Sequence, residues 1–341
     1  MVFRKGTKIS KSNLSYYETN EIEIVTEYKY LGIDLTYNLS FTNLLEKKLT
    51  SAKIAINSTW LNYIHNTKIN LSSKIFNTAS KSIMFYGAQI YGFERYEQVE
   101  KLFRFFIKKI LYLPANTPNY MLHLETGMNC LYIETLRLHF NYINRVLSLP
   151  ATRLPKMLAE EAISKNIYWA NKWLSIFSNF DINFSFTTRG VSLVELQMSA
   201  LENIINHDLE LHLNSAKSSQ FHDTYKLLDH TSPSYFNNNN SQYMMSLIFK
   251  TRGGLLNLNA RSFRSNTDEL CTLCNENQPE NTFHFVAVCP IFSHERRIRF
   301  GKSILSTTEY LDILNGNNFV NLYFYISNCI NYRNLIISEF I

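Results

Sequence analysis

The sequence predicts a mostly α-helical protein with a short β-hairpin near the N-terminus and, near the C-terminus, a small module that a cluster of cysteine and histidine side chains holds together. Three observations lead to this fold class. A β-rich stretch occupies residues 21–35, apolar residues recur at intervals of three and four in the segments after it, and three of the five cysteines lie with a histidine between residues 271 and 289. The hydrophobic content of 45% is that of a globular chain.

The stretch EIEIVTEYKYLGIDL, residues 21–35, predicts two strands. Ile22, Ile24, Tyr28 and Tyr30 alternate with or stand among charged residues, as in strands with one exposed face. Gly32 permits a turn between the strands because glycine tolerates a positive φ. A hairpin is therefore expected here.

The segment FTNLLEKKLTSAKIAINSTWL, residues 41–61, predicts an amphipathic helix. Its apolar stripe is formed by Leu45, Leu49, Ala52, Ile56 and Trp60, which recur at intervals of three and four. The next helix contains Ser80, Met84 and Gly87 and is less sharply patterned, so we expect it to pack on two sides.

A third helix, at about residues 97–112, separates its two faces most clearly. The apolar face is formed by Val99, Leu102, Phe103, Phe106 and Ile110. Lys101, Arg104 and Lys108, joined by Lys109, form a basic face. Two interpretations stay open: a solvated charged face opposite a core, or a helix that lies along a phosphate backbone and releases its counterions.

The remaining chain alternates between helices and breaks. Pro114 ends the third helix, and a short helix from Leu122 is expected to end at Gly127. Residues 151–230 read as mostly helical. The segment TSPSYFNNNNSQY, residues 231–243, has the composition of a linker.

Charge is distributed unevenly along the chain, whose formal net charge is +6. Residues 1–150 hold 18 Lys and Arg against 11 Asp and Glu, whereas the counts are 8 against 9 in residues 151–250 and 8 against 8 in residues 251–341. A polyanionic partner, RNA or DNA, is therefore most plausible for the first 150 residues. The same region contributes Lys47, Lys48 and Lys53 as candidate contacts.

No uncharged apolar run approaches the roughly 20 residues that span a bilayer. Nothing at the N-terminus resembles a signal peptide, and Cys130 and Cys329 lie in apolar surroundings that suit buried thiols better than disulfides. We therefore expect an intracellular chain, cytoplasmic or nuclear, with no membrane partner.

The cysteine cluster has the pattern C-x2-C-x9-H-x4-C, made by Cys271, Cys274, His284 and Cys289. A C-x2-C turn places two thiolates on one side of a loop, and a second pair completes the tetrahedron of Zn²⁺. The spacing predicts a structural zinc site; fortuitous packing of apolar cysteines is the alternative. A catalytic zinc is less favoured because four protein ligands leave no position for water or substrate.

Basic residues flank this cluster on both sides. Lys250, Arg252, Arg261 and Arg264 precede it, and Arg296, Arg297, Arg299 and Lys302 follow it. Three thiolates around Zn²⁺ carry a net charge of about −1, so phosphate would be attracted by these neighbours and not by the metal. Phe283 and Phe285 suit either base stacking or a small core, and we favour the core.

The order of these features resembles a known family. The pieces are MVFRKG, YKYLGIDL, LEKKLTSAKIA, SIMFYGAQIYG, LPANTPNYMLHLETG, LIFKTRGGLLNLNAR and CTLCNENQPENTFHFVAVCPIFSHERR. Together they resemble the region that follows the polymerase palm in reverse transcriptases of non-LTR retrotransposons, including jockey-like elements. The resemblance extends from residue 1 to about 335.

The resemblance implies a division into five parts. Residues 1–38 would be the end of the palm, 39–150 a helical thumb, 151–240 a helical linker, 241–302 a zinc-knuckle module and 303–341 C-terminal helices. Cys271, Cys274, His284 and Cys289 would be the zinc ligands. The x9 loop departs from the shorter x4 loop of retroviral knuckles.

The catalytic residues of that family are missing from this sequence. Its polymerases hold Mg²⁺ with palm aspartates that include a Tyr-x-Asp-Asp turn, and no two aspartates are adjacent here. We expect no Mg²⁺ site, no endonuclease and no polymerase activity from this chain alone, but a truncated remnant that binds RNA or DNA. The alternatives are a functionless relic, a zinc-stapled protein-interaction module, a polymerase whose palm an incomplete gene model has lost, and a partner of an intact reverse transcriptase in trans.

Overall fold

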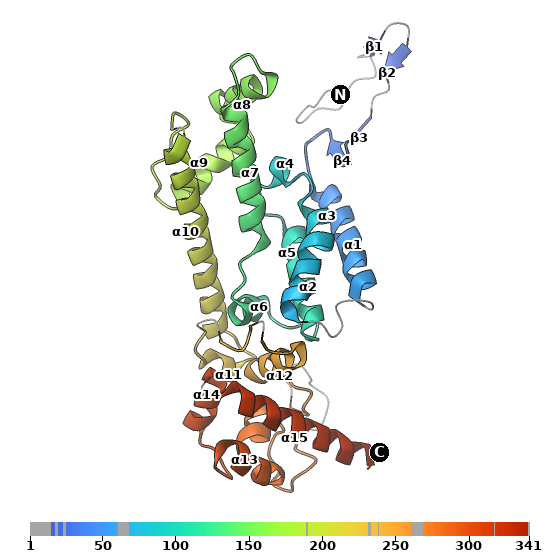
Figure 1. Cartoon of the computed structure of the whole chain (residues 1–341), viewed down its shortest axis with the longest axis vertical. Coiled ribbons are helices and arrows are strands. Elements are labelled where there is room, and N and C mark those ends of the chain that lie inside the picture. Colours follow the sequence, from blue (N-terminus) through green and yellow to red (C-terminus); the bar gives the residue numbers. More distant parts are fainter. Residues whose placement is uncertain are drawn as a thin grey trace. The chain divides into compact units, whose positions relative to one another are not determined.

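The computed structural model describes residues 15–17, 20–22, 25–60, 68–188, 190–230, 233–237, 239–260, 269–316 and 318–339. Over these residues the chain is mostly α-helical, with short antiparallel strand pairs near the N-terminus (Figure 1). This confirms the fold class that the sequence predicts. Two compact units are present. Unit 1 takes in the described residues of 1–57, 77–102 and 131–201, and unit 2 those of 58–76, 103–130 and 202–341.

The strands form two hairpins. Strand β1 (Ser15–Tyr17) pairs with β2 (Asn20–Ile22), and β3 (Glu27–Tyr30) pairs with β4 (Ile33–Thr36). Leu31 and Gly32 join β3 to β4 with φ angles of 48° and 79°. Two consecutive positive φ angles are typical of the type I′ turn, whose twist matches that of the strands. The predicted turn at Gly32 is therefore confirmed.

The helices distribute between the units as follows. Helices α1 (Thr42–Thr59), α5 (Glu97–Ile110) and α10 (Gly190–Lys217) and the π-helix η2 (Phe76–Lys81) have residues in both units. Unit 1 also contains α3 (Ser82–Phe85), α4 (Ala88–Tyr91), α7 (Leu131–Leu147), α8 (Leu154–Ser164) and α9 (Trp169–Asn179). Unit 2 also contains α2 (Ile69–Ile75), α6 (Asn119–Thr126), α11 (Asp223–Lys226), α12 (Gln242–Arg252), η3 (His284–Val288), η4 (Pro290–Phe292), α13 (Ser293–Phe300), α14 (Thr307–Asn315) and α15 (Phe319–Glu339).

Aromatic side chains fill much of the core of unit 1. The ring of Trp173 packs edge-on against Phe140 at 4.8 Å and Trp169 at 5.1 Å between centroids. Edge-to-face contacts of this kind add to the apolar area that the rings bury. Helix α7 begins where the buried carboxylate of Glu100 accepts the backbone N–H groups of Leu131 and Tyr132, which would otherwise lack partners at a helix start.

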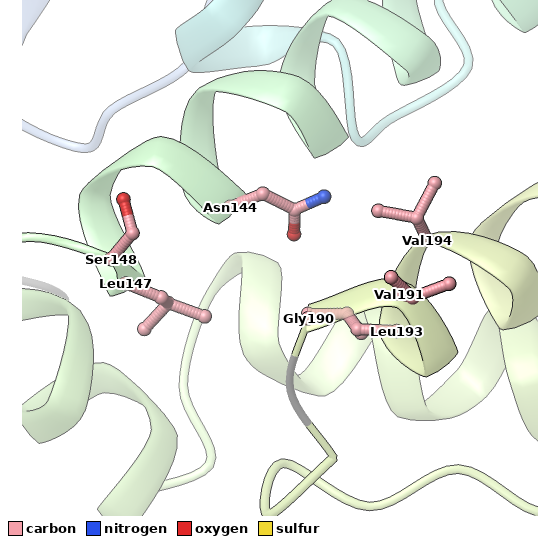
Figure 2. A pocket seen from close by; sticks show the side chains of 7 residues that line it. All are labelled: Asn144, Leu147, Ser148, Gly190, Val191, Leu193 and Val194. Atoms are coloured by element: carbon pink, nitrogen blue, oxygen red, sulfur yellow. The ribbon is translucent and has the colours of Figure 1, made fainter.

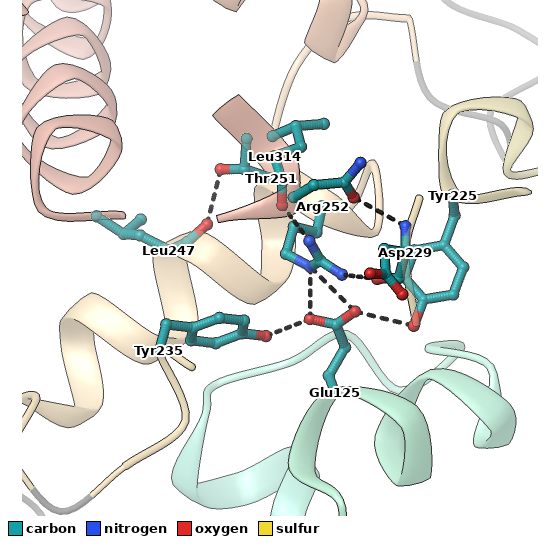
Figure 3. Close-up of polar contacts among 9 residues, drawn as sticks. Glu125, Tyr225, Asp229, Tyr235, Leu247, Thr251, Arg252 and Leu314 are labelled. Atoms are coloured by element: carbon teal, nitrogen blue, oxygen red, sulfur yellow. Dashed lines mark hydrogen bonds and ion pairs between the residues drawn. The ribbon is translucent and has the colours of Figure 1, made fainter. Parts of the chain in front are cut away.

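Unit 2 is organised around a buried ion pair, drawn in Figure 3. Arg252, at the end of α12, donates from Nε to both carboxylate oxygens of Glu125 in α6, at 2.8 and 3.1 Å. The hydroxyls of Tyr225 and Tyr235 donate to the same carboxylate at 3.0 and 2.5 Å. Helix α6 then ends at Gly127, whose φ is 64°, so the glycine stop that the sequence predicts is confirmed.

The segment expected to be a linker, residues 231–243, contributes to the core of unit 2. Tyr235 is 1% exposed, and the Gln242 amide donates to Ser72 Oγ at 2.7 Å. The segment is therefore anchored at Tyr235 and Gln242, whereas Ser234, Asn237, Asn239, Ser241 and Tyr243 are exposed. The division into five parts stays a prediction.

Among the helices that the structure describes, none is both long and apolar enough to cross a bilayer.

Candidate metal centre

The first half of the centre is a small hairpin at residues 269–280. Leu270 bridges Pro279, and the N–H of Cys271 donates to the carbonyl of Gln278 at 2.9 Å. Asn277 closes the loop with a φ of 53°, a conformation that asparagine tolerates better than most residues. This tight loop directs the side chains of Cys271 and Cys274 to the same side of the hairpin, where their sulfur atoms lie close together.

The second half is the π-helix η3. The N–H of Cys289 donates to the carbonyl of His284 at 2.8 Å, which closes a turn from residue i to residue i+5. In an α-helix, side chains five residues apart point about 140° away from each other. The wider π-turn brings His284 and Cys289 nearer to one face, so the x4 spacing becomes compatible with one metal ion.

The four side chains meet in the interior of unit 2. Their ligand atoms all lie within 4.8 Å of one another, and Cys274 Sγ lies 3.4 Å from Nε2 of His284. All four residues are buried, and the three thiols are free. A tetrahedral Zn²⁺ with Zn–S bonds of about 2.3 Å would hold its ligands ~3.8 Å apart. The cluster that the sequence predicts is thus assembled, and its dimensions are compatible with a metal.

The acidity of the thiols fits a cation at this position. The hydrogen bond from the Cys289 thiol lowers the pKa of Cys271 to about 5 and raises the pKa of Cys289, and burial raises the pKa of Cys274. Burial of Cys274 and the hydrogen bond between Cys289 and Cys271 favour protons on these two sulfurs, and further thiolates beside the first would add repulsion. A divalent cation that replaces those protons removes the repulsion.

An ion pair and a backbone hydrogen bond hold the hairpin in place. The carboxylate of Glu280, fully buried, accepts from Arg333 of α15 at 2.6 and 2.7 Å and from the N–H of Asn259 at 2.9 Å. The side chain of Asn281 accepts from the N–H of His284 at 2.8 Å. The ring of Phe285 is 0% exposed, so the favoured interpretation of this residue as core is confirmed.

Three of the basic residues expected to contact nucleic acid are buried, which corrects that prediction. Arg252 and Arg296 are 0% exposed and Lys48 is 8% exposed. Arg252 is held by Glu125, and Lys48 donates to the carbonyl of Tyr86. Burial lowers the pKa of Lys48 to about 8. A phosphate cannot reach any of these three cations where they lie.

The other predicted contacts differ in how accessible their charges are. Lys47 is exposed, but its Nζ pairs with Glu27 at 3.0 Å and Asp34 at 2.7 Å, which fastens α1 to the β3–β4 hairpin. Arg299 pairs with Glu295 at 2.9 Å. Lys53 is half-buried and Arg297 is exposed. Arg261 and Arg264 lie outside the described residues, as does MVFRKG.

Helix α5 keeps the basic face that the sequence predicts. Lys101 is exposed, Arg104 and Lys108 are half-buried on the same face, and burial and the neighbouring Arg104 lower the pKa of Lys108. Lys109 Nζ lies 5.1 Å from the ring centroid of Trp60. The charges of Arg104 and Lys108 are thus close enough to repel each other, and an anion would relieve that repulsion.

Sequence reasoning missed Tyr112, whose ring contacts the same Trp60 as Lys109 does. Its side chain is 44% exposed just past the end of α5, and its ring packs edge-on against Trp60 at 5.7 Å. An exposed aromatic ring beside lysines is the arrangement on which single-stranded bases stack. The only sequence signal was its place after the KKIL run.

A hollow in unit 1 has no titratable side chain among its described lining residues. It has a volume of about 560 Å³ and is lined by residues at the end of α7 and the start of α10, shown in Figure 2. The lining residues are Asn144, Leu147, Ser148, Gly190, Val191, Leu193 and Val194. None of them titrates near neutral pH, so acid–base catalysis has no candidate there.

No family model, curated protein or solved structure matches this chain.

Proposed function

We propose that this chain is related to the region that follows the palm in reverse transcriptases of non-LTR retrotransposons, that a structural Zn²⁺ stabilises its unit 2, and that it binds RNA or DNA. The observation that carries the proposal is the buried Cys3His cluster, which stands where the resemblance implies a zinc knuckle. Three thiolates and one imidazole are ligands that Zn²⁺ prefers, and four of them fill its coordination shell. The metal is therefore a staple and not a catalyst.

Nucleic acid would bind through helix α5 and not through the metal. The zinc centre has a net charge of about −1, which does not attract phosphate. Lys101, Arg104 and Lys108 lie on one face of α5, and Tyr112 follows it with an exposed ring. Cations would hold the backbone and the aromatic ring would stack on a base, a combination that tolerates any sequence.

The proposed metal site is tested by measuring how many equivalents of Zn²⁺ the purified chain contains. The purified chain is expected to contain one equivalent of Zn²⁺, and Co²⁺ in its place is expected to give the absorption bands of a tetrahedral thiolate site. Cys274→Ser should lower the metal content and the melting temperature of unit 2, whereas Cys130→Ser, which changes a thiol outside the cluster, should leave the metal content intact. Full metal content in Cys274→Ser would contradict the assignment of this ligand.

Nucleic-acid binding is tested by its salt dependence. Charge reversal of Lys101, Arg104 and Lys108 to Glu should make the plot of log affinity against log salt shallower by about 2–3, since each phosphate contact contributes roughly 0.7–0.9. The matched control reverses Arg145, Arg153 and Lys217, three exposed cations elsewhere. If both triple variants change the slope equally, binding does not depend on α5. If the wild type binds neither RNA nor DNA, or binds without salt dependence, the nucleic-acid function is wrong and the metal site stands alone.

A further inference from the structure

Arg296, in helix α13, is a buried cation, and the hydrogen bonds that it makes within the described residues all go to neutral groups. Its guanidinium donates from Nε to the carbonyl of Ser303 at 2.7 Å, from Nη1 to the hydroxyl of Tyr325 at 3.0 Å and from Nη2 to the carbonyl of Cys289. Its side chain is 0% exposed. An arginine so far from water ordinarily has a carboxylate beside it, because an uncompensated buried charge is strongly unfavourable.

The other buried arginines of unit 2 each have such a carboxylate. Arg252 pairs with Glu125 at 2.8 Å and Arg333 pairs with Glu280 at 2.6 Å, and both carboxylates are buried as well. Within the described part of the chain, Arg296 has no ion-pair partner. The acidic residue next to it in sequence, Glu295, pairs with Arg299 instead. What Arg296 does contact is the peptide carbonyl of a metal ligand.

We propose that Arg296 is the internal counter-charge of the metal–thiolate centre and also positions two of its ligands. The inference rests on the proposed metal site. A divalent ion held by three thiolates and a neutral imidazole has a net charge of −1, which one buried guanidinium balances. The centre supplies the anion that Arg296 lacks, and Arg296 supplies the cation that the centre lacks.

The hydrogen bonds show how this residue positions the ligands. Arg296 binds the carbonyl of Cys289 directly, and Tyr325, which accepts from Arg296, donates to the carbonyl of Phe285 at 2.8 Å. The guanidinium therefore fixes the π-turn directly at Cys289 and, through Tyr325, at Phe285 next to His284. Arg297, the next residue, points to solvent. Of the two adjacent arginines, only Arg296 is therefore buried beside the metal centre, whereas Arg297 is exposed to solvent.

The test compares two replacements of Arg296 by metal affinity, measured for Zn²⁺ by competition with a chromophoric chelator at one fixed pH. Arg296→Lys keeps the charge, whereas Arg296→Gln keeps a hydrogen-bond donor of similar size and removes the charge. Loss of an outer partner of a metal site typically weakens affinity 10- to 100-fold. We expect about that loss for Arg296→Gln and a clearly smaller loss for Arg296→Lys, which keeps the charge but cannot keep all three hydrogen bonds.

A second background separates charge from packing. Cys274→His converts the centre to two thiolates and two imidazoles, which with Zn²⁺ is neutral. In that background the loss caused by Arg296→Gln should shrink to a few-fold. Equal losses in both backgrounds, or equal losses for Lys and Gln, would overturn the counter-charge role and leave a packing role.

The outcomes also distinguish a failure of the counter-charge role from a failure of the proposed metal site on which it rests. If the wild-type chain binds no Zn²⁺, the proposed metal site fails and this inference fails with it. If the wild type binds Zn²⁺ and Arg296→Gln binds it equally well, the metal site stands and only the counter-charge is wrong. Circular dichroism of each variant, with and without metal, shows whether a lost affinity is merely a lost fold; unfolded variants that regain neither fold nor metal at saturating Zn²⁺ count against the proposal.

Discussion

Glu125→Gln, an isosteric change, is expected to destabilise unit 2 strongly. The glutamine keeps the shape of Glu125 but has one amide oxygen where the carboxylate accepts from Tyr225 at Oε1 and from Tyr235 at Oε2, and it leaves Arg252 without a negative partner. Both members of the pair are buried, with side-chain exposures of 1% and 0%. Removing one charge of such a pair costs about 3–5 kcal/mol, since the remaining charge is uncompensated away from water.

The measurement is local because the chain has two units and need not unfold in one step. Hydrogen exchange with mass spectrometry should show lower protection in α6 and α12 and unchanged protection in α8 and α9, which belong to unit 1. The control is the double variant Glu125→Gln/Arg252→Met, which removes both charges and should recover most of the protection. A loss below about 1 kcal/mol in the single variant, or no recovery in the double variant, would refute the reasoning.

Three further predictions concern other parts of the chain. A Cβ at Gly92 would lie far inside van der Waals contact of the Thr135 carbonyl, so Gly92→Ala should destabilise unit 1 by about 1–3 kcal/mol in thermal unfolding; an unchanged melting temperature would contradict this. Burial lowers the pKa of His139 to about 4 from 6.5, so its contribution to stability is complete above pH 6.5 and is lost as the pH falls to 4, by up to about 3 kcal/mol. His139→Asn, which can still donate to the Gln89 carbonyl, should flatten this part of the stability curve. Tyr112→Ala should weaken binding of single-stranded RNA by about 1–3 kcal/mol while Tyr112→Phe retains it, and equal affinities would exclude stacking.

Local patterns were enough to predict the hairpin turn, helix α5 and the cysteine cluster. Each depends on residues near one another in the chain: two turn residues, an apolar stripe, or four ligands within residues 271–289. The apolar face expected on α5 is buried from Val99 to Ile110. In these places the sequence neighbours are also the spatial neighbours, so spacing carries the information.

The burial of some basic residues could not be predicted from local patterns. Arg252 is buried because Glu125, 127 positions away, lies beside it. Arg296 is buried against backbone carbonyls, which every residue type has and no sequence pattern marks. Charged side chains without a partner are almost always exposed, so an isolated run of arginines is interpreted as surface. Arg252 and Arg296 were predicted to be exposed because a single sequence does not show the long-range contacts that bury them.

The placement of the Glu280–Arg333 pair has a consequence for the order in which the chain folds. The four ligands lie within one short loop, whereas Glu280 and Arg333 are separated by 53 positions. Closing the shorter loop costs less entropy, and a chain synthesised from its N-terminus completes all four ligands before helix α15 exists. We therefore expect metal capture to come first and to create the surface on which the last helix docks. If the proposed metal is bound, chains made without it would lack part of the surface on which α15 packs.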